Sequence, residues 1–462
     1  MKIYNTKTRT IEKIIPHQEG EIKLYTCGPT VYHYAHIGNL RTYIMEDVLE
    51  KALTYLGYKV TRVMNITDVG HLTSDADSGD DKMVKSAEKE KKTVLDIAEY
   101  YTDAFWQDAK KLNITKPEIV SNATDNIDEY IKIIEKLIAT DYAYITGDNV
   151  YFDTSKVKEY YALTNQNESD LLEGARDTVE KDDNKKNKTD FVLWFTKSKF
   201  KDQELKWESP WGLGYPGWHI ECSGICIKYL GEYLDIHCGG VDNIFPHHTN
   251  EIAQSEAYLG SSWCKYWFHA EHLNDESGKM SKSHGETLTI NTLIEKGYDP
   301  LSYRFLCLSS HYRNQLTFTY EALDGATNAY KKLKNKIQNL KPSETLDEEA
   351  YTKYDNEFKG QLENNLNTAN AITLIFDLLS SDVNDKTKLT LIDAWDKVLS
   401  LNLIEKNSFT EEEKKEIEDA IKKRQEAKEK KDFNTSDIIR DELLAKGIVL
   451  EDTKEGTKYK RQ

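Results

Sequence analysis

The sequence predicts an α/β fold in which an insertion interrupts a parallel sheet. A helical region and a small C-terminal domain follow the sheet. Residues 25–31 have the glycine and proline pattern of a strand end, 40–58 suit a helix, and 59–66 are β-branched like a strand. A strand, a helix and a second strand within about 45 residues favour a parallel sheet. From near residue 302 to 401 the apolar spacing is helical.

Composition limits the class of protein. The 462 residues carry 62 Lys and Arg against 79 Asp and Glu, a net charge of −17, so nucleic acid would need a local basic surface. This length allows roughly two to four domains. Six cysteines are too few for a disulfide scaffold. No apolar run approaches the ~18 residues that cross a bilayer. The first residues lack the apolar core of a secretory signal, so we expect a cytoplasmic protein without membrane contact.

The middle of the chain alternates helices with polar segments. Residues 68–92 are polar and charged, which predicts a loop and a solvated helix start, whereas 93–112 and 127–140 have helical apolar spacing. Residues 163–205 are rich in Lys, Asp and Asn and contain the strand-like run 191–195. We interpret this polar region as part of an insertion between two halves of the sheet.

The tail predicts a separate small domain. A capping-box start at Ser408 opens a helix with an apolar stripe, and a second helix over 434–446 stops at Gly447, before the strand-like 447–450. Residues 422–462 contain 12 Lys and Arg and 9 Asp and Glu, which gives +3 within a −17 protein. The surface is either an ordinary solvated helical face or one that faces RNA.

Residues 29–39 place a strand end, a turn and a helix start in sequence. The N-terminus of a helix has free N–H groups and a positive dipole end, which suit a phosphate. His36 can donate to phosphate oxygens, and Gly38 lets a ligand approach the backbone. The alternative for His36 is an ordinary helix cap.

A second motif is the sequence Lys279-Met280-Ser281-Lys282-Ser283. Two lysines on a loop can neutralise a triphosphate and follow its charge onto departing pyrophosphate, which is electrostatic stabilisation of a transition state. The alternative is a solvated basic loop without a ligand.

A third group of residues has the chemistry of a metal site. Cys27 follows the first strand, and Cys222 lies 195 residues later. His247 and Glu251 have the i, i+4 spacing that places them on one helix face. Two thiolates, an imidazole and a carboxylate make a plausible zinc set. The alternative is that both cysteines are buried structural thiols.

The first two motifs, in this order on an α/β chain, resemble the signatures of class I aminoacyl-tRNA synthetases, which embrace ATP at the carboxyl edge of the sheet. From end to end the chain is similar to the cysteinyl-tRNA synthetase family. The stretches that carry the resemblance are YTCGPTVYHYAHIGN, MNITDVGHLTSDAD, DFVLWF, SPWGLGYPGWHIECS, LDIHCGGVDNIFPHHTNEIAQSEA, YWFH, GKMSKS and KDFNTSDIIRDELLAKGIVLEDTKEGTKY.

The resemblance implies a Rossmann-type catalytic domain in two halves. The expected divisions are 1–125 for its first half, 126–205 for the connective insertion, 206–268 for the second half with the zinc site, 269–320 for the lysine loop and stem-contact region, 321–404 for a helical bundle and 405–462 for an anticodon-binding domain.

The resemblance also implies roles for individual residues. The expected zinc ligands, for one ion per chain, are Cys27, Cys222, His247 and Glu251. The residues expected to act in catalysis and to bind ATP are His36, Asn39, Lys279 and Lys282. Asn39 stands in the place of the family's usual second histidine. Asp242 would meet the ATP ribose, and Thr67 and Trp218 would line the cysteine pocket.

We therefore expect a monomeric ligase that uses ATP, with magnesium, to join L-cysteine to tRNA(Cys) through cysteinyl-adenylate. A soft metal would separate cysteine from serine better than a pocket can, because zinc prefers thiolate to hydroxyl. Two alternatives remain. One is the related ligase that joins cysteine to an amino-sugar, which lacks a tail domain. The other is a non-catalytic paralogue that binds zinc or tRNA.

Overall fold

The computed structural model describes residues 1–69, 72–74, 78–81, 86, 93–164, 184–197, 205–275, 278–279, 288–341, 345–404, 411–430, 432–453 and 456–461. The chain divides into two compact units, Met1–Leu403 and Ile404–Gln462. Among the described residues, no helix combines the length and the hydropathy needed to span a bilayer.

The central sheet of the larger unit is parallel throughout, with its five strands in the order β13, β12, β3, β4 and β7. Their bounds are Cys264–Ala270, Leu234–Gly240, Glu21–Thr26, Lys59–Ile66 and Ile119–Asn122, in that order. The strand order reverses between β3 and β12, which is the switch point where open α/β sheets bind their ligands.

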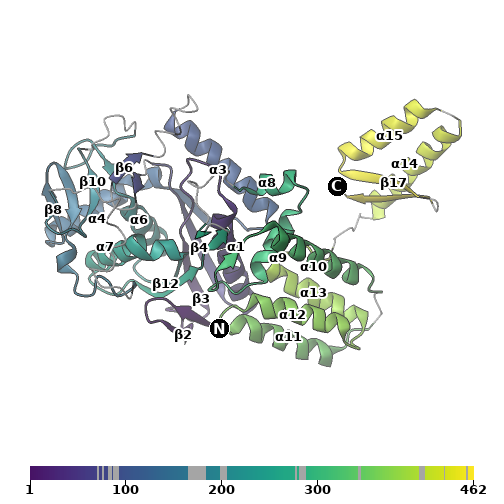
Figure 1. Ribbon diagram of the computed structural model, residues 1–462, viewed down its shortest axis with the longest axis horizontal. Helices are drawn as coiled ribbons and strands as arrows, with labels where there is room; N and C mark the ends of the chain where they lie inside the picture. Colours follow the sequence, from purple (N-terminus) through teal and green to yellow (C-terminus); the bar gives the residue numbers. More distant parts are fainter. Residues whose placement is uncertain are drawn as a thin grey trace. The chain divides into compact units, whose positions relative to one another are not determined.

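Helices cover both faces of this sheet. Helix α1 (Ile37–Tyr55) lies on one face, and α4 (Ile127–Ala139), α6 (Trp218–Leu230) and α7 (Thr249–Leu259) lie on the other (Figure 1). Helix α3 (Val94–Lys111) begins with a capping box at Thr93. The predicted α/β fold class, with its parallel sheet, is therefore confirmed.

Strand alternation decides which side chains meet which helix. Tyr25 and Val63 belong to the apolar core shared with α4 and α6, whereas their neighbours Thr26 and Arg62 point toward α1. There Arg62 Nη2 lies 3.7 Å from Oε2 of Glu46, and both side chains are fully buried. Burial raises the pKa of Glu46 to about 8, although Arg62 opposes the shift.

We expect Glu46→Gln to change the pH dependence of stability. An acid whose pKa is raised on folding destabilises the native state as pH rises from its unfolded pKa to its folded pKa. The free energy of unfolding of the variant, relative to that of the wild type, should therefore increase from pH 5 to pH 9. The increase is at most roughly 1.4 kcal/mol for each pH unit that separates the unfolded from the folded pKa. Urea unfolding at both pH values measures this, and a difference that does not vary with pH would contradict it.

A second, antiparallel sheet has the order β11, β10, β9, β8, and its edge strand β11 lies beyond the insertion expected at 126–205. Its strands are β8 (Ala143–Thr146), β9 (Asn149–Phe152), β10 (Phe191–Phe195) and β11 (Tyr215–Pro216). The predicted strand over 191–195 is confirmed. The residues of this insertion at 165–183 and 198–204 lie outside the described part of the chain.

Short strands and a helical bundle complete the larger unit. Strand β14 (Leu273–Asp275) pairs with β15 (Gly278–Lys279) and β16 (Leu316–Thr317). The helices that follow are α8 (Ile290–Glu295), α9 (Pro300–Leu308), α10 (Tyr320–Gln338), α11 (Glu348–Glu363), α12 (Thr368–Ser380) and α13 (Asp385–Leu399). The predicted helical region is confirmed.

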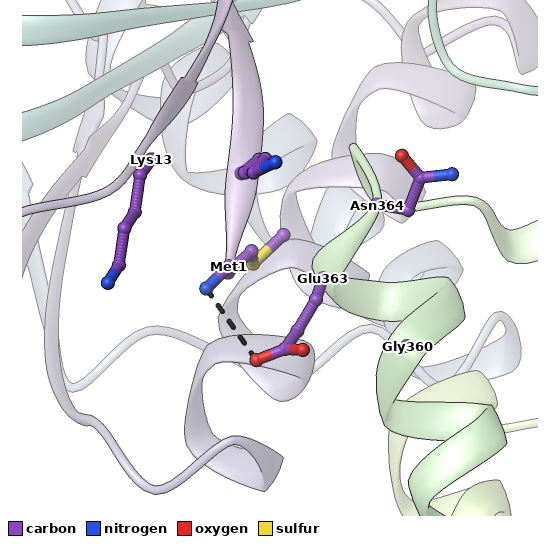
Figure 2. Close-up of a pocket in the computed structure, with 6 residues that line it drawn as sticks. Met1, Lys13, Gly360, Glu363 and Asn364 are labelled. Atoms are coloured by element: carbon purple, nitrogen blue, oxygen red, sulfur yellow. Dashed lines mark ion pairs between the residues drawn. The ribbon is translucent and has the colours of Figure 1, made fainter.

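The N-terminal hairpin joins the bundle to the sheet. Strand β1 (Lys2–Asn5) pairs with β2 (Thr10–Lys13). A pocket lies where β1 meets the end of α11 (Figure 2), and there the Met1 amine is 3.8 Å from Glu363 Oε1. The Asn365 backbone N–H donates to the Lys2 carbonyl at 3.0 Å. A main-chain hydrogen bond therefore also connects β1 to the residues that follow α11.

The smaller unit has a core of its own. Helices α14 (Glu411–Glu429) and α15 (Phe433–Ala445) pack against the hairpin of β17 (Ile448–Thr453) and β18 (Gly456–Arg461). Apolar residues fill the centre, among them Ile417, Leu443 and Ile448. The two predicted helices and the strand after Gly447 are confirmed, and residues 405–410, with the predicted helix start at Ser408, lie outside the described range.

One expectation was wrong. Residues 68–92 include an antiparallel hairpin of β5 (Leu72–Ser74) and β6 (Ser78–Asp81), where a loop was predicted. Glycine and acidic residues have low strand propensity, so the sequence pattern does not indicate these strands.

Candidate functional site

The site begins where β3 ends, at the switch point of the sheet. Cys27 follows β3 directly, and its backbone N–H donates to the carbonyl of Cys238 in β12 at 3.2 Å. A Cβ on the next residue, Gly28, would lie 1.6 Å from the Asn65 carbonyl oxygen. Glycine therefore allows the chain to turn against β4 and to carry the Cys27 thiol to this edge.

Four potential metal ligands meet at this edge. Ligand atoms of Cys27, Cys222, His247 and Glu251 all lie within 4.8 Å of one another. The two sulfurs are 4.0 Å apart, and His247 Nε2 is 3.0 Å from Glu251 Oε1. Cys222 comes from α6 and Glu251 from α7, so the chain brings the four together from β3, α6 and the start of α7.

This donor set fits zinc. Tetrahedral zinc with bonds of about 2.3 Å to sulfur places two thiolates roughly 3.8 Å apart, close to the 4.0 Å between Cys27 and Cys222. Glu251 Oε1 is buried, and the other proposed ligand atom His247 Nε2 lies 3.0 Å from it. A second set replaces Cys222 and His247 by His237 and His248 but keeps Cys27 and Glu251, so both sets outline one site.

The electrostatics favour a cation. Burial opposes ionisation of Cys222, but its hydrogen bond with Cys27 and the charge on His247 lower its pKa to about 6. Burial likewise opposes the charge on Glu251, yet His237 and His247 lower the pKa of this carboxyl to about 2. Glu251 and Cys222 in turn raise the pKa of His247 to about 10 despite its burial, so without a metal this imidazole carries the positive charge. A metal ion would replace that proton, and the thiolate and the carboxylate are already in the state in which they bind a metal.

A chain of buried histidines supports the ligands. His237 Nε2 lies 2.9 Å from Glu251 Oε2. His248 Nδ1 lies 2.8 Å from His269 Nε2, and His269 Nδ1 lies 2.8 Å from the hydroxyl of Thr6. Such contacts fix the orientation of ligating side chains.

The sequence interpretation missed these supporting histidines. A signal was available, because His237 lies in the middle of the strand-like stretch 234–240 and His269 lies next to the end of the stretch 264–270. Parallel strands end at the same edge of a sheet, so such residues converge. Gly239 adds to this, because a Cβ there would lie 2.8 Å from the His248 ring.

The two residues expected in the cysteine pocket flank the metal ligands. The ring of Trp218 lies 4.1 Å from that of His247, which also approaches His219 with 3.0 Å between their Nδ1 atoms. The Thr67 hydroxyl donates to Glu221 Oε2 at 2.9 Å. Glu221, which the sequence interpretation also missed, is buried beside Cys222, and burial raises the pKa of its carboxyl. Thr67 is thereby held in one orientation.

The expected nucleotide contacts lie at the start of α1 and after β12. His36 is the N-cap of α1, and its Nδ1 accepts a hydrogen bond from the Asn39 N–H at 3.1 Å. The helix-cap alternative for His36 is therefore correct for this atom. Asp242 lies in the short helix η3 (Val241–Asn243) directly after β12, with Oδ1 3.3 Å from His272 Nε2.

The lysine motif is only partly described. Lys279 ends β15, paired with Asn274 of β14. Lys282 falls within 280–287, outside the described residues. The other four cysteines, Cys226, Cys238, Cys264 and Cys307, are buried.

Comparison with known proteins agrees with this geometry. A family model described as "tRNA synthetases class I (C) catalytic domain" matches residues 13–328. A cysteine–tRNA ligase from Treponema denticola is 47% identical over 100% of this chain and 99% of its own length. One from Borrelia turicatae is 44% identical over the same shares, and one from Burkholderia lata is 41% identical over 99% of this chain and 96% of its length.

Solved structures show the same fold. The methionyl-tRNA synthetase of Mycobacterium tuberculosis in complex with methionyl-adenylate has a TM-score of 0.53 at 13% identity, covering 82% of this chain and 90% of that one. At this identity the likeness concerns the fold alone. The family model and the full-length relatives carry the conclusion that this chain belongs to the class I tRNA synthetases, in the family of the cysteine–tRNA ligases.

Proposed function

We propose that this protein joins L-cysteine to tRNA(Cys), using ATP and passing through cysteinyl-adenylate with release of pyrophosphate. The observation that carries the proposal is the buried set of two thiols, an imidazole and a carboxylate at the switch point of the sheet. A metal held by this set would select for a thiol, which supports cysteine as the amino acid. The relatives named cysteine–tRNA ligase, which match over the whole chain, support the same activity.

Selection of cysteine falls to the metal site and the residues around it. Zinc held by Cys27, Cys222, His247 and Glu251 supplies preference for a soft thiolate over the hydroxyl of serine. The ring of Trp218 packs against that of His247 and would line the pocket for the cysteine side chain. The Thr67 hydroxyl, held by Glu221, offers its oxygen to the substrate's ammonium group.

Adenylate formation falls to positioning and charge rather than to a covalent enzyme intermediate. The first turn of α1 presents backbone N–H groups and its dipole to the phosphates, and Asp242 accepts from the ribose. Lys279 and Lys282 neutralise the triphosphate, which is bound with magnesium, and follow the charge onto the departing pyrophosphate.

Two assays test this function. Cysteine-dependent exchange of pyrophosphate into ATP is expected for the enzyme and is absent from a paralogue that only binds zinc or tRNA. Transfer of cysteine to tRNA(Cys) separates the proposal from a ligase that joins cysteine to an amino-sugar. A protein that exchanges but does not charge tRNA would contradict the tRNA part of the proposal.

The smaller unit is proposed to read the anticodon. Its helices and hairpin enclose a separate core, and Arg424 and Lys428 of α14 bind Asp452 of β17 at 2.7 to 3.1 Å. Anticodon bases are read by stacking and edge hydrogen bonds, which need a small structured platform of this kind. The remaining divisions of the chain stay as proposed from the resemblance, with the catalytic halves around the insertion at 126–205 and the bundle at 321–404.

We expect truncation after Leu403 to separate the two activities. Pyrophosphate exchange should remain nearly intact, because the proposed ATP and cysteine residues all precede this point, whereas tRNA charging should fall steeply. Both activities and the melting temperature are measured on one truncated sample. Equal loss of exchange and charging, with a lower melting temperature, would mean that the tail only stabilises the bundle.

A further inference from the structure

We propose that Arg41 is a positioning residue for ATP. Its side chain holds the first turns of α1 in register with the chain segment that enters the lysine motif. The inference rests on the proposed function, because it concerns the nucleotide which that function requires. It assigns Arg41 a role in the alignment of the separate pieces of the nucleotide site, without contact between Arg41 and the nucleotide.

The guanidinium of Arg41 binds four backbone carbonyls. Nη1 donates to Glu271 at 2.8 Å and to His272 at 2.6 Å. Nη2 donates to Asn314 at 2.6 Å and to His311 at 3.4 Å. Arg41 itself is fully buried. One side chain of α1 thus fastens two remote chain segments, one of which runs directly into β14.

The chain is hydrogen-bonded to α1 both before and after the lysine motif. Before it, Arg41 holds the residues that lead into β14, and β14 pairs with the strand that ends at Lys279. After it, the carbonyl of Leu288 accepts from the N–H of Ile37, the first residue of α1, at 2.8 Å. Any shift of α1 against β14 therefore moves the helix start relative to Lys279.

A third piece of the site depends on the same contact. His272, whose carbonyl Arg41 holds, extends its side chain to Asp242, with His272 Nε2 3.3 Å from Asp242 Oδ1. Arg41 is therefore linked through His272 to Asp242, the carboxylate proposed to accept from the ribose. It lies five residues from the helix cap at His36, on the same helix.

The chemistry of a guanidinium explains why arginine suits this place. Its planar fork presents five donors in fixed directions, which a single ammonium cannot match. Burial lowers the pKa of Arg41, although the nearby Cys307, Tyr303 and Glu271 oppose the shift. A buried cation is costly unless hydrogen bonds compensate it, so the four carbonyls stabilise both the charge and the register.

The chain offers a matched control in Arg304. It is also fully buried and also bonds to backbone carbonyls, those of Leu399 and Leu112, at 2.7 and 2.9 Å. Its ion pair with Asp47 reaches α1 as well, at 2.7 Å. Asp47 lies further along the helix, however, and the carbonyls that Arg304 binds are at the ends of α3 and α13 rather than at the proposed nucleotide site.

The test compares Arg41→Met and Arg41→Lys with Arg304→Met and Arg304→Lys in the full-length zinc-loaded protein. All four variants should have a lower melting temperature. Only the Arg41 variants should change ATP kinetics, with kcat/KM for ATP in pyrophosphate exchange lower by about 10²-fold for the methionine, as expected for a misplaced reactant. Arg41→Lys should recover part of this loss. The Kd for cysteine, measured by calorimetry without ATP, should stay within about threefold of the wild-type value, because the substitution leaves the residues proposed to bind cysteine in place.

The outcomes separate cleanly. Arg41→Lys that loses thermal stability while keeping wild-type kcat and KM for ATP would show a purely structural role, and this variant decides the question if Arg41→Met does not fold. Equal kinetic loss in Arg41→Lys and Arg304→Lys would also overturn the proposal. A wild-type protein without cysteine-dependent exchange would instead contradict the proposed function.

Discussion

Cys222→Ser is expected to remove the bound metal and cysteine activation together. Serine cannot supply the soft thiolate that zinc prefers. Even loss of a residue that only supports a ligand costs roughly 10- to 100-fold in affinity or activity, so loss of a ligand should lower cysteine-dependent pyrophosphate exchange by more than about 10²-fold. Metal analysis of the purified protein should fall from about one zinc per chain to near none.

Cys226→Ser is the matched control. Cys226 lies one turn further along α6 and is also buried, but it belongs to neither potential ligand set. Its replacement places the same hydroxyl in a similar interior, so metal content and exchange should persist even if stability falls. Full zinc in Cys222→Ser, or equal metal loss in both variants, would move the metal away from Cys27 and Cys222.

Lys282→Ala is expected to slow adenylate formation. Removing one electrostatic donor to the departing pyrophosphate should lower kcat for exchange on the order of 10²–10³-fold, because the lost interaction strengthens in the transition state. The Kd for cysteine should barely change. Lys296→Ala, which removes the same charge from an exposed position at the end of α8, should leave kcat near the wild-type value.

The two kinetic constants distinguish the possible roles of Lys282. An unchanged kcat with a raised KM for ATP would mean that this lysine binds the ground state and transition state equally, as an anchor. That result would contradict the assigned role in charge transfer to pyrophosphate.

Local elements could be predicted well from the sequence. The β-branched run at 59–66 is β4 with the same bounds. Helix α1 begins at Ile37, three residues before the predicted start, because the imidazole of His36 caps the helix and lets it begin earlier. It ends at Tyr55, before the predicted 58, because Gly57 adopts a positive φ of 95°.

Contacts that depend on strand order could not be predicted. Cys238 reaches Cys27 only because β12 lies beside β3, although over 200 residues separate the two strands. His237 reaches Glu251 because α7 packs back against the strand that precedes it. Glu221 looked like an ordinary helical acid, and only the tertiary fold buries it against Thr67. The four proposed metal ligands, which the structure brings together, were chosen because the family resemblance supplied what spacing alone left open.

The network around Asp47 has a consequence for synthesis of the chain. Asp47 accepts from Arg304, and Lys51 donates to the Ser400 hydroxyl, contacts that span 257 and 349 residues. Translation proceeds from the N-terminus, so the first helix leaves the ribosome long before these partners exist. Until they arrive, Asp47 has only the local ammonium of Lys51 as counter-ion, and a buried carboxylate with incomplete partners is disfavoured. The final packing around Asp47 therefore waits for Arg304, and the hydrogen bond of Lys51 to Ser400 forms later still.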